Sequence, residues 1–228
     1  FKVGSQMVEM ICAHQKVTKA EARNMAEEAL KRVGIPDARR RMEAYPYELS
    51  GGMCQRVIIA MSVCSKPQMI IADEPTTALD VTVQAQVLEQ LNQLRERFGT
   101  ALIIITHNLG IVARYADTVK IMYGGKIVED GPTDEVFENP QHPYTLGLIR
   151  AVPRLDLPRS HGLYTIEGEP PDMSKIPPDC CAFHSRCKYA DELCRSCRPQ
   201  PEQVGERHWC ACFHRELAQA EREEVLSI

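Results

Sequence analysis

The chain has 228 residues, of which 44% are hydrophobic and 25% are charged, and its formal net charge is −4. This is a globular composition, and it excludes an intrinsically disordered chain. The slightly acidic net charge provides no basic surface for nucleic acid. No run approaches the 18 or more apolar residues of a membrane helix, so we expect any membrane association to come through a partner.

Residues 1–48 have the pattern of helices. Thr18 and Glu21 have the spacing of a capping box, and the apolar residues from Ala22 to Val33 then recur at helical intervals. Gly34 is a natural residue just past the end of such a helix. A shorter helix with the same periodicity is predicted before Thr18.

Alternating strands and helices are predicted after Pro46. The apolar run Met69–Ala72 is typical of a strand that is buried on both faces of a sheet. A helix is predicted from Val81 to Arg97, with Gly99 closing it, and a second buried strand from Ala101 to Ile105. A strand, a helix and a strand over this length form a βαβ unit, whose two strands are parallel.

The character of the chain changes toward its end. Asp117–Met122 and Lys126–Glu129 predict a hairpin. Eleven of the 15 prolines lie from Pro132 onward, which favours extended segments and disfavours long helices. We place a boundary near residue 140.

The segment Leu49–Met53 leads into a predicted helix. Ser50 is a good N-cap, and Gly51 and Gly52 leave the first helical turn uncovered, so free N–H groups and the positive end of the helix dipole form an anion site. Taken alone, the same sequence is equally typical of a capped core helix.

Three titratable side chains follow the two predicted strands. Asp73 and Glu74 come at the end of the first strand, and His107 comes at the end of the second. Because parallel strands end at the same sheet edge, where α/β sheets bind ligands, we expect Glu74 and His107 to lie close together. There Asp73 could hold Mg²⁺, usually through water, and Glu74 could polarise an attacking water.

Four motifs in this order resemble those of the ABC-transporter ATPases: the signature (Leu49–Arg56), the Walker B strand (Met69–Pro75), the D-loop (Ala78–Asp80) and the switch histidine (Thr106–Asn108). The resemblance implies an α/β fold, here a partial P-loop NTPase with an α-helical subdomain, and hydrolysis of ATP with Mg²⁺ as the cofactor. Met53 stands where many members have Gln, and Asn108 where Asp is usual.

The same resemblance implies a role for each site residue. The signature of one subunit contacts the γ-phosphate held by a second ATPase subunit, which assigns nucleotide contacts to Ser50, Gly51, Gly52 and Gln55. Asp73 becomes the Mg²⁺ carboxylate, and Asp80 a contact of the dimer. Glu74 becomes the catalytic base, and His107 the γ-phosphate sensor.

The phosphate-binding loop of this family does not occur in the chain. No G-x-x-x-x-G-K-[ST] sequence is present, and the glutamine loop that precedes the helical subdomain is missing as well. We therefore expect the chain, which begins at Phe1, to be the later part of an ATPase subunit that does not hydrolyse ATP by itself.

Seven of the ten cysteines lie between Cys180 and Cys212. Disulfides are disfavoured because ABC ATPases work in the cytosol, where thiols stay reduced. Zinc sites usually contain close C-x2–4-C pairs, and only Cys194 and Cys197 form one, whereas a [4Fe–4S] cluster needs four thiolates without a fixed short pair. The spacing favours the cluster slightly and leaves zinc as the alternative.

Three further segments, His142–Thr145, Gly168–Pro171 and Cys181–Ala190, resemble the C-terminal extension of oligopeptide and dipeptide importer ATPases. Some of these proteins carry an iron–sulfur cluster there. The resemblance implies the ligands Cys181, Cys187, Cys194 and Cys212. Cys180 stands where the family usually has Gly, and Cys197 and Cys210 are additional.

We therefore predict part of an ATP-binding subunit that energises peptide import, peripheral on the cytoplasmic face of the cell membrane. Its expected partners are integral-membrane permease subunits, a second ABC ATPase subunit and, indirectly, an extracytoplasmic peptide-binding protein, with no nucleic acid. The predicted domains are a helical subdomain (1–65), part of the ATPase core (66–139) and the extension (140–228). Two alternatives are an ABC-type ATPase acting on DNA and a non-catalytic metal-binding regulatory module.

Overall fold

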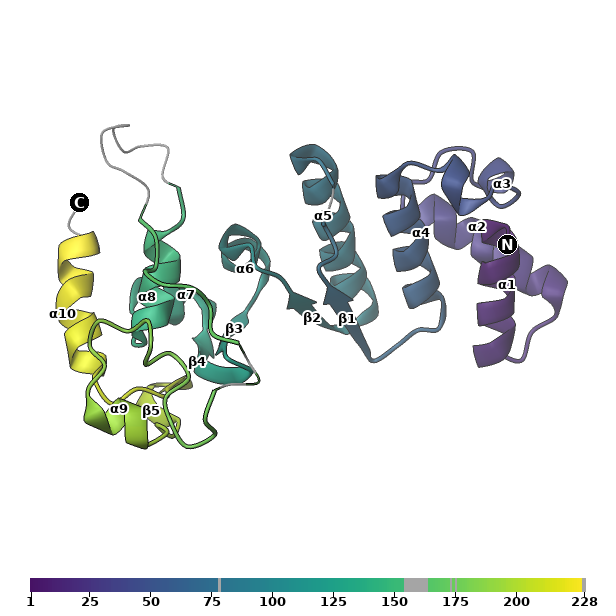
Figure 1. Cartoon of the computed structure of the whole chain (residues 1–228). Helices are drawn as coiled ribbons and strands as arrows, with labels where there is room; N and C mark the ends of the chain where they lie inside the picture. Colours follow the sequence, from purple (N-terminus) through teal and green to yellow (C-terminus); the bar gives the residue numbers. More distant parts are fainter. Residues whose placement is uncertain (78, 154–163, 173, 175, 227–228) are drawn as a thin grey trace. The chain divides into compact units, whose positions relative to one another are not determined.

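The computed structural model describes residues 1–77, 79–153, 164–172, 174 and 176–226, which form two compact units (Figure 1). The N-terminal unit is Phe1–His107 and the C-terminal unit is Asn108–Ile228. Both contain helices and strands, which confirms the α/β prediction. The division into 1–65, 66–139 and 140–228 stays a prediction. None of the described helices is both long and apolar enough to cross a bilayer.

The N-terminal unit begins with helices and ends with a strand–helix–strand segment. Its elements are α1 (Val3–His14), α2 (Lys19–Arg32), α3 (Ala38–Arg41), the 3-10 turn η1 (Pro46–Glu48), α4 (Gly51–Cys64), β1 (Met69–Asp73), α5 (Val81–Phe98) and β2 (Ala101–Ile105). The predicted helices, the two strands and their order are confirmed.

Side chains fix where these helices begin. The capping box is present, because Thr18 Oγ1 accepts from the Glu21 N–H while the Glu21 carboxylate accepts from the Thr18 N–H. Asp80 caps α5 by accepting from the Val83 N–H at 2.9 Å. Gly99 ends α5 in the left-handed conformation with φ of 62°, which glycine adopts without strain.

The core of the N-terminal unit lies among α1, α2, α4 and α5. Met7 and Ile11 of α1, Leu30 of α2 and Val87 of α5 are completely buried in it, and Ala60 supplies the small residue of α4. Their burial removes one apolar face of each helix from water, and this is the main stabilising term for short helices.

Strands β1 and β2 pair in parallel, with Asp73 opposite Ile105, which confirms the βαβ prediction. The prediction that both strands are buried on both faces is wrong for the described chain. Met69 and Ile71 are 51% and 62% exposed, and Ile103 is 43% exposed. The reason is that the sheet has two strands, and no described element of the N-terminal unit covers its second apolar face.

The C-terminal unit contains α6 (Leu109–Tyr115), β3 (Thr118–Tyr123), β4 (Lys126–Pro132), α7 (Thr133–Glu138), α8 (Pro143–Arg150), α9 (Glu192–Ser196), β5 (Glu202–Gly205), β6 (His208–Cys210) and α10 (Arg215–Leu226). The predicted hairpin is present as β3 and β4. Among the prolines the helices are short, as expected, with six, eight and five residues in α7, α8 and α9.

The sheet of the C-terminal unit joins segments that are far apart in the sequence. Its strand order is β3-β4-β6-β5, with β4 antiparallel to β6. An aromatic cluster packs on this sheet, because the ring of Tyr123 lies 4.6 Å from that of Tyr144 and 5.0 Å from that of Phe183. This cluster anchors the segment that begins at Cys181 to the hairpin and to α8.

Helix α10 lies beside α8 in Figure 1. Glu221 of α10 is largely buried. Its carboxylate accepts hydrogen bonds from the Arg150 guanidinium, from Lys188 Nζ at 2.6 Å and from the Tyr189 hydroxyl at 2.5 Å. Burial raises the pKa of Glu221, but hydrogen bonds from Lys188 and Tyr189 outweigh it and hold the pKa below the ordinary value. One carboxylate thus fastens α10 to two other segments.

We predict that Glu221→Gln destabilises the C-terminal unit by about 2 kcal/mol, because charge-assisted hydrogen bonds of this kind contribute on that scale. Urea unfolding monitored by the fluorescence of Trp209, the single tryptophan, measures this unit. Since the folded pKa is depressed, the difference from the unsubstituted chain should be full at neutral pH and shrink as the pH falls below about 4. The control is Glu216→Gln, the same change at an exposed position of α10; equal losses from both variants would contradict the fastening role.

Candidate functional site

The start of α4 has the predicted cap. Ser50 accepts from the Met53 N–H at 3.3 Å, while Gly51 and Gly52 form the first turn and Gln55 lies half-buried in the next. Ser50 and Gly51 are exposed, so the N–H groups of this turn and the dipole of a 14-residue helix are open to an anion.

Gly52 permits a close approach between α4 and α5. A Cβ atom at this position would lie 2.5 Å from Val83 Cγ1, a distance at which something must move. Val83 is the residue whose N–H is capped by Asp80, so the starts of the two helices lie against each other. The structure therefore brings the signature and Asp80 of the D-loop together, whereas Ala78 lies outside the described residues.

Asp73 and Glu74 follow one another at the end of β1 but differ in surroundings. Asp73 is the last residue of the strand and is exposed, opposite Ile105 of β2. Glu74 adopts the left-handed conformation with φ of 46°, and its N–H donates to the Ile105 carbonyl at 2.9 Å. A non-glycine residue with this φ is uncommon, and such strain is concentrated at functional sites.

Glu74 and His107 lie in direct contact, as the sequence predicts. Glu74 Oε1 lies 2.7 Å from His107 Nδ1 and accepts from the His107 N–H at 3.3 Å, while Oε2 accepts from the Thr77 hydroxyl at 3.2 Å. The hydrogen bond from His107, ahead of that from Thr77, lowers the pKa of Glu74. The site therefore presents an ionised carboxylate beside an imidazole that is 85% exposed.

This edge can hold a cation and activate water. Asp73 and Glu74 are successive carboxylates, and the first of them is exposed, so they are suitable ligands for Mg²⁺. An ionised carboxylate that is hydrogen-bonded to histidine can accept a proton from a water molecule within hydrogen-bond distance. The roles of Ser50, Gly52, Asp73, Asp80, Glu74 and His107 stay predictions.

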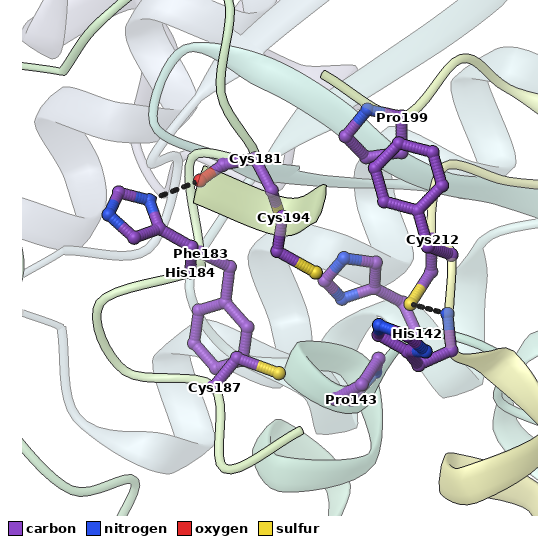
Figure 2. A pocket seen from close by; sticks show the side chains of 11 residues that line it. His142, Pro143, Cys181, Phe183, His184, Cys187, Cys194, Pro199 and Cys212 are labelled. Carbon is purple, nitrogen blue, oxygen red and sulfur yellow. Dashed lines mark hydrogen bonds between the residues drawn. The ribbon is translucent and has the colours of Figure 1, made fainter. Parts of the chain in front are cut away.

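Four cysteines meet at one small cavity in the C-terminal unit. Cys181 and Cys187 reach it from one loop, Cys194 from α9 and Cys212 from the segment after β6 (Figure 2). Rings of His142, Phe183 and His214 complete the wall. The four positions predicted as metal ligands are thus brought together. Cys197 is exposed and does not line this cavity.

Burial dominates the chemistry of these thiols. Burial, with smaller contributions from the neighbouring thiols, raises the pKa of Cys181 to about 11 and that of Cys212 to about 12. The pKa values of Cys187 and Cys194 are raised for the same reason. Without a cation the thiols stay protonated at neutral pH, and a metal ion that binds them must displace those protons.

The sequence patterns missed two residues beside the thiols. Asp191, Cys194 and His214 each offer a ligand atom, and the three atoms lie within 4.8 Å of one another. Asp191 accepts from the Cys194 N–H at 3.0 Å and lies 3.0 Å from His214 Nε2. The backbone bond from Cys194, ahead of the interaction with His214, lowers the pKa of Asp191 to about 2. The sequence signal that could have identified Asp191 is its position directly before α9, which is typical of a residue that caps a helix.

Two family models match the chain. The model described as "ABC transporter" matches residues 3–77, and the model described as "Oligopeptide/dipeptide transporter, C-terminal region" matches residues 128–194. The first match lies in the N-terminal unit and contains Ser50 and Glu74. The second lies in the C-terminal unit and ends at Cys194.

Curated relatives cover most of the chain. The oligopeptide transport ATP-binding protein OppD of Salmonella typhimurium is 48% identical over 199 residues, which is 87% of this chain and 59% of that protein. OppD of Bacillus subtilis is 46% identical over 209 residues, which is 92% of this chain and 58% of that protein. The chain therefore spans about three fifths of the length of these relatives.

Solved structures share the fold of part of the chain. The ATP-binding cassette MJ0796, in a dimeric post-hydrolysis state bound to ADP and phosphate, matches with a TM-score of 0.52 and 24% identity over 58% of this chain and 57% of that one. CbiO1 of Clostridium perfringens, part of an ABC transporter complex, matches with a TM-score of 0.51 and 32% identity over 60% of this chain and 53% of that one.

We predict that His107→Ala raises the pKa of Glu74 toward the ordinary carboxyl value, because the hydrogen bond from His107 is the largest cause of the lowered pKa. NMR titration of the Glu74 side-chain carboxyl carbon measures the shift. Thr77→Val removes the weaker hydrogen bond and should produce a smaller shift in the same direction. If Thr77→Val has the larger effect, His107 is not the main partner of the carboxylate.

Proposed function

We propose that this chain is part of an ATP-hydrolysing subunit that energises peptide import. Its residues 3–77 match the ABC transporter family, and its residues 128–194 match the oligopeptide/dipeptide transporter C-terminal region. The observation that carries the proposal is the contact of Glu74 with His107 at the ends of two parallel strands, in the same unit as the capped, glycine-opened start of α4.

Each residue has a part in the proposed reaction. Glu74 accepts the proton of the water that attacks the γ-phosphate of ATP, and His107 orients this carboxylate and contacts the phosphate. Asp73 supplies an oxygen ligand toward Mg²⁺, whose charge neutralises that developing on the phosphate oxygens.

The start of α4 acts on a nucleotide held by another subunit. Ser50 and the N–H groups of the first turn stabilise the charge of a phosphate that the other subunit holds. They are therefore supplied in trans, as an arginine finger is. Gly52 is required because it lets α4 lie against α5, where Asp80 fixes the first turn. This arrangement supports a dimer of ATPase subunits with nucleotide between them.

Membrane attachment is proposed to come through permease subunits that dock on the helical part of the N-terminal unit. Tyr47 is 82% exposed, its ring stacks on Tyr45 at 5.4 Å, and Ile58 is 57% exposed. Exposed aromatic and aliphatic side chains of this kind are suited to a protein partner.

The net charge of −4 and the importer-type C-terminal region favour peptide import over an ATPase acting on DNA.

We predict that Glu74→Gln lowers ATP hydrolysis by at least about 100-fold, because the amide cannot accept the proton of the attacking water. Because residues 1–228 contain no P-loop sequence, the enzyme to be tested joins the N-terminal part of the Salmonella relative to this chain. Residues 1–228 alone should show no turnover.

The matched control is Glu89→Gln, the same chemical change at an exposed position of α5, which should leave the rate unchanged. A chimera with Glu74→Gln that hydrolyses ATP as fast as the unsubstituted chimera would show that Glu74 is not the base.

We also propose that Cys181, Cys187, Cys194 and Cys212 hold a [4Fe–4S] cluster. Four thiolates around one zinc ion would lie about 3.8 Å apart, given Zn–S bonds of about 2.3 Å. Among the described residues, however, the only set of three ligand atoms within 4.8 Å of one another contains a single thiol. A cluster in which each thiolate binds a different iron suits wider spacing, and when bound it supplies a one-electron couple and ties three segments together.

We predict that anaerobically purified protein contains about four irons and four sulfides per chain, and that Cys→Ser at any of the four positions lowers both. Iron and acid-labile sulfide assays measure this. Cys197→Ser, at the exposed thiol outside the cavity, should retain full content. Colourless protein with one zinc per chain would overturn the cluster and would point instead to the set formed by Asp191, Cys194 and His214.

A further inference from the structure

His142 is a buried polar residue that has no part in the proposed ATP hydrolysis and is not among the four proposed cluster ligands. It is the residue before α8, only 1% of its surface is exposed, and its ring lines the same cavity as the four thiols (Figure 2). The ring of Phe183 lies 5.8 Å away and closes one side of it.

The hydrogen bond at one ring nitrogen fixes the position of the proton on the other. His142 Nδ1 lies 3.0 Å from the Tyr144 backbone nitrogen and caps the first turn of α8. A backbone N–H can only donate, so Nδ1 is the acceptor and carries no proton. The imidazole is therefore neutral with its proton on Nε2.

Glu129 holds this residue in place. Its carboxylate is completely buried on β4 and accepts from the His142 N–H at 3.0 Å, from the Gln141 N–H at 2.7 Å and from His208 Nε2 at 2.9 Å. With its backbone bonded to Glu129 and its ring bonded to Tyr144, His142 has a single orientation. No described residue accepts a hydrogen bond from Nε2, which leaves this donor for the cavity.

We propose that the Nε2–H of His142 donates a hydrogen bond to a sulfur of the cluster held by Cys181, Cys187, Cys194 and Cys212, and so acts as a positioning residue that raises its reduction potential. The inference rests on the proposed cluster. A hydrogen bond to a ligand sulfur stabilises the more negative, reduced state, and burial of the site strengthens this effect.

His184 lines the same cavity but is placed differently. Its Nδ1 lies 2.7 Å from the Cys181 carbonyl oxygen, which can only accept, so the proton of His184 is directed to the backbone. Of these two histidines, His142 is therefore the one with a donor left for the sulfurs.

Two substitutions at His142 separate the cap from the donor. In His142→Asn the side-chain oxygen can still cap α8, since Asn is a strong N-cap, but no donor reaches the Nε2 position. In His142→Gln the amide nitrogen can occupy the Nε2 position while the cap is lost. The matched control is His184→Asn, whose amide can still donate to the Cys181 carbonyl.

The experiment uses residues 1–228 purified anaerobically, with iron content, midpoint potential by mediated redox titration and urea unfolding monitored at Trp209. His142→Asn is expected to retain its iron and its stability while its midpoint potential falls. The expected fall corresponds to about a tenfold change in the ratio of oxidised to reduced protein at a fixed potential, which is about 59 mV for one electron. His142→Gln should retain the potential and lose stability, and His184→Asn should retain both.

Absence of iron from the unsubstituted chain would defeat the cluster proposal itself. Iron present with an unchanged potential in His142→Asn would overturn the inference and leave His142 as a helix cap only. Loss of iron in both His142 variants alike would also overturn it, because the ring would then act through the fold of the site and not through its Nε2–H.

Discussion

The buried carboxylate of Glu129 is the constraint on which the C-terminal unit depends. A carboxylate removed from water must have its oxygens hydrogen-bonded, and leaving such a group unpaired costs about 3–5 kcal/mol. Glu129 meets this requirement with two backbone N–H groups before α8 and the ring of His208 on β6. Strand β4, strand β6 and the start of α8 are therefore held at one point. Cys212, two residues beyond β6, and His142 are placed at the thiol cavity by the same interaction.

The N-terminal unit positions its functional groups by backbone geometry. Parallel pairing sets Asp73 opposite Ile105, and the next residues on both strands then bring Glu74 and His107 into contact. The absence of a side chain at Gly52 sets the approach of α4 to α5. The groups at this edge remain exposed to solvent, because strand ends and helix starts can position them without burying them. This differs from the thiol cavity, where burial itself changes the chemistry.

Local patterns in the sequence predicted the elements and the pair at the sheet edge. Thr18 with Glu21 and the helix after Asp80 are short-range features, and the contact of Glu74 with His107 follows from one βαβ unit. The pairing of β4 with β6 joins residues about 80 positions apart, and nothing local indicates that His208 is the partner of Glu129. The same holds for the contact of Glu221 with Arg150. Long-range polar contacts of this kind depend on the packed fold.

The two parallel strands of the N-terminal unit are more exposed than their sequence predicts. The strands Met69–Asp73 and Ala101–Ile105 carry apolar side chains on both faces, which is the pattern of strands covered on both sides. Among the described residues of the N-terminal unit only one face is covered, and Ile71 and Ile103 are exposed on the other. A sequence pattern reports the environment for which a strand is suited, whereas exposure depends on every element that packs against it.

Solvent exposure also determines what the Glu74–His107 pair can do. The His107 side chain is 85% exposed and that of Glu74 is 37% exposed, so water and salt screen their interaction and it contributes little to stability. The same two groups become far stronger electrostatically when water is excluded, because the effective dielectric constant around them falls. In the proposed dimer, where the site closes only when nucleotide lies between two subunits, the pair would therefore keep its carboxylate ionised and oriented while the site is open. It would gain catalytic strength on closing, when the phosphate charge is present to be stabilised.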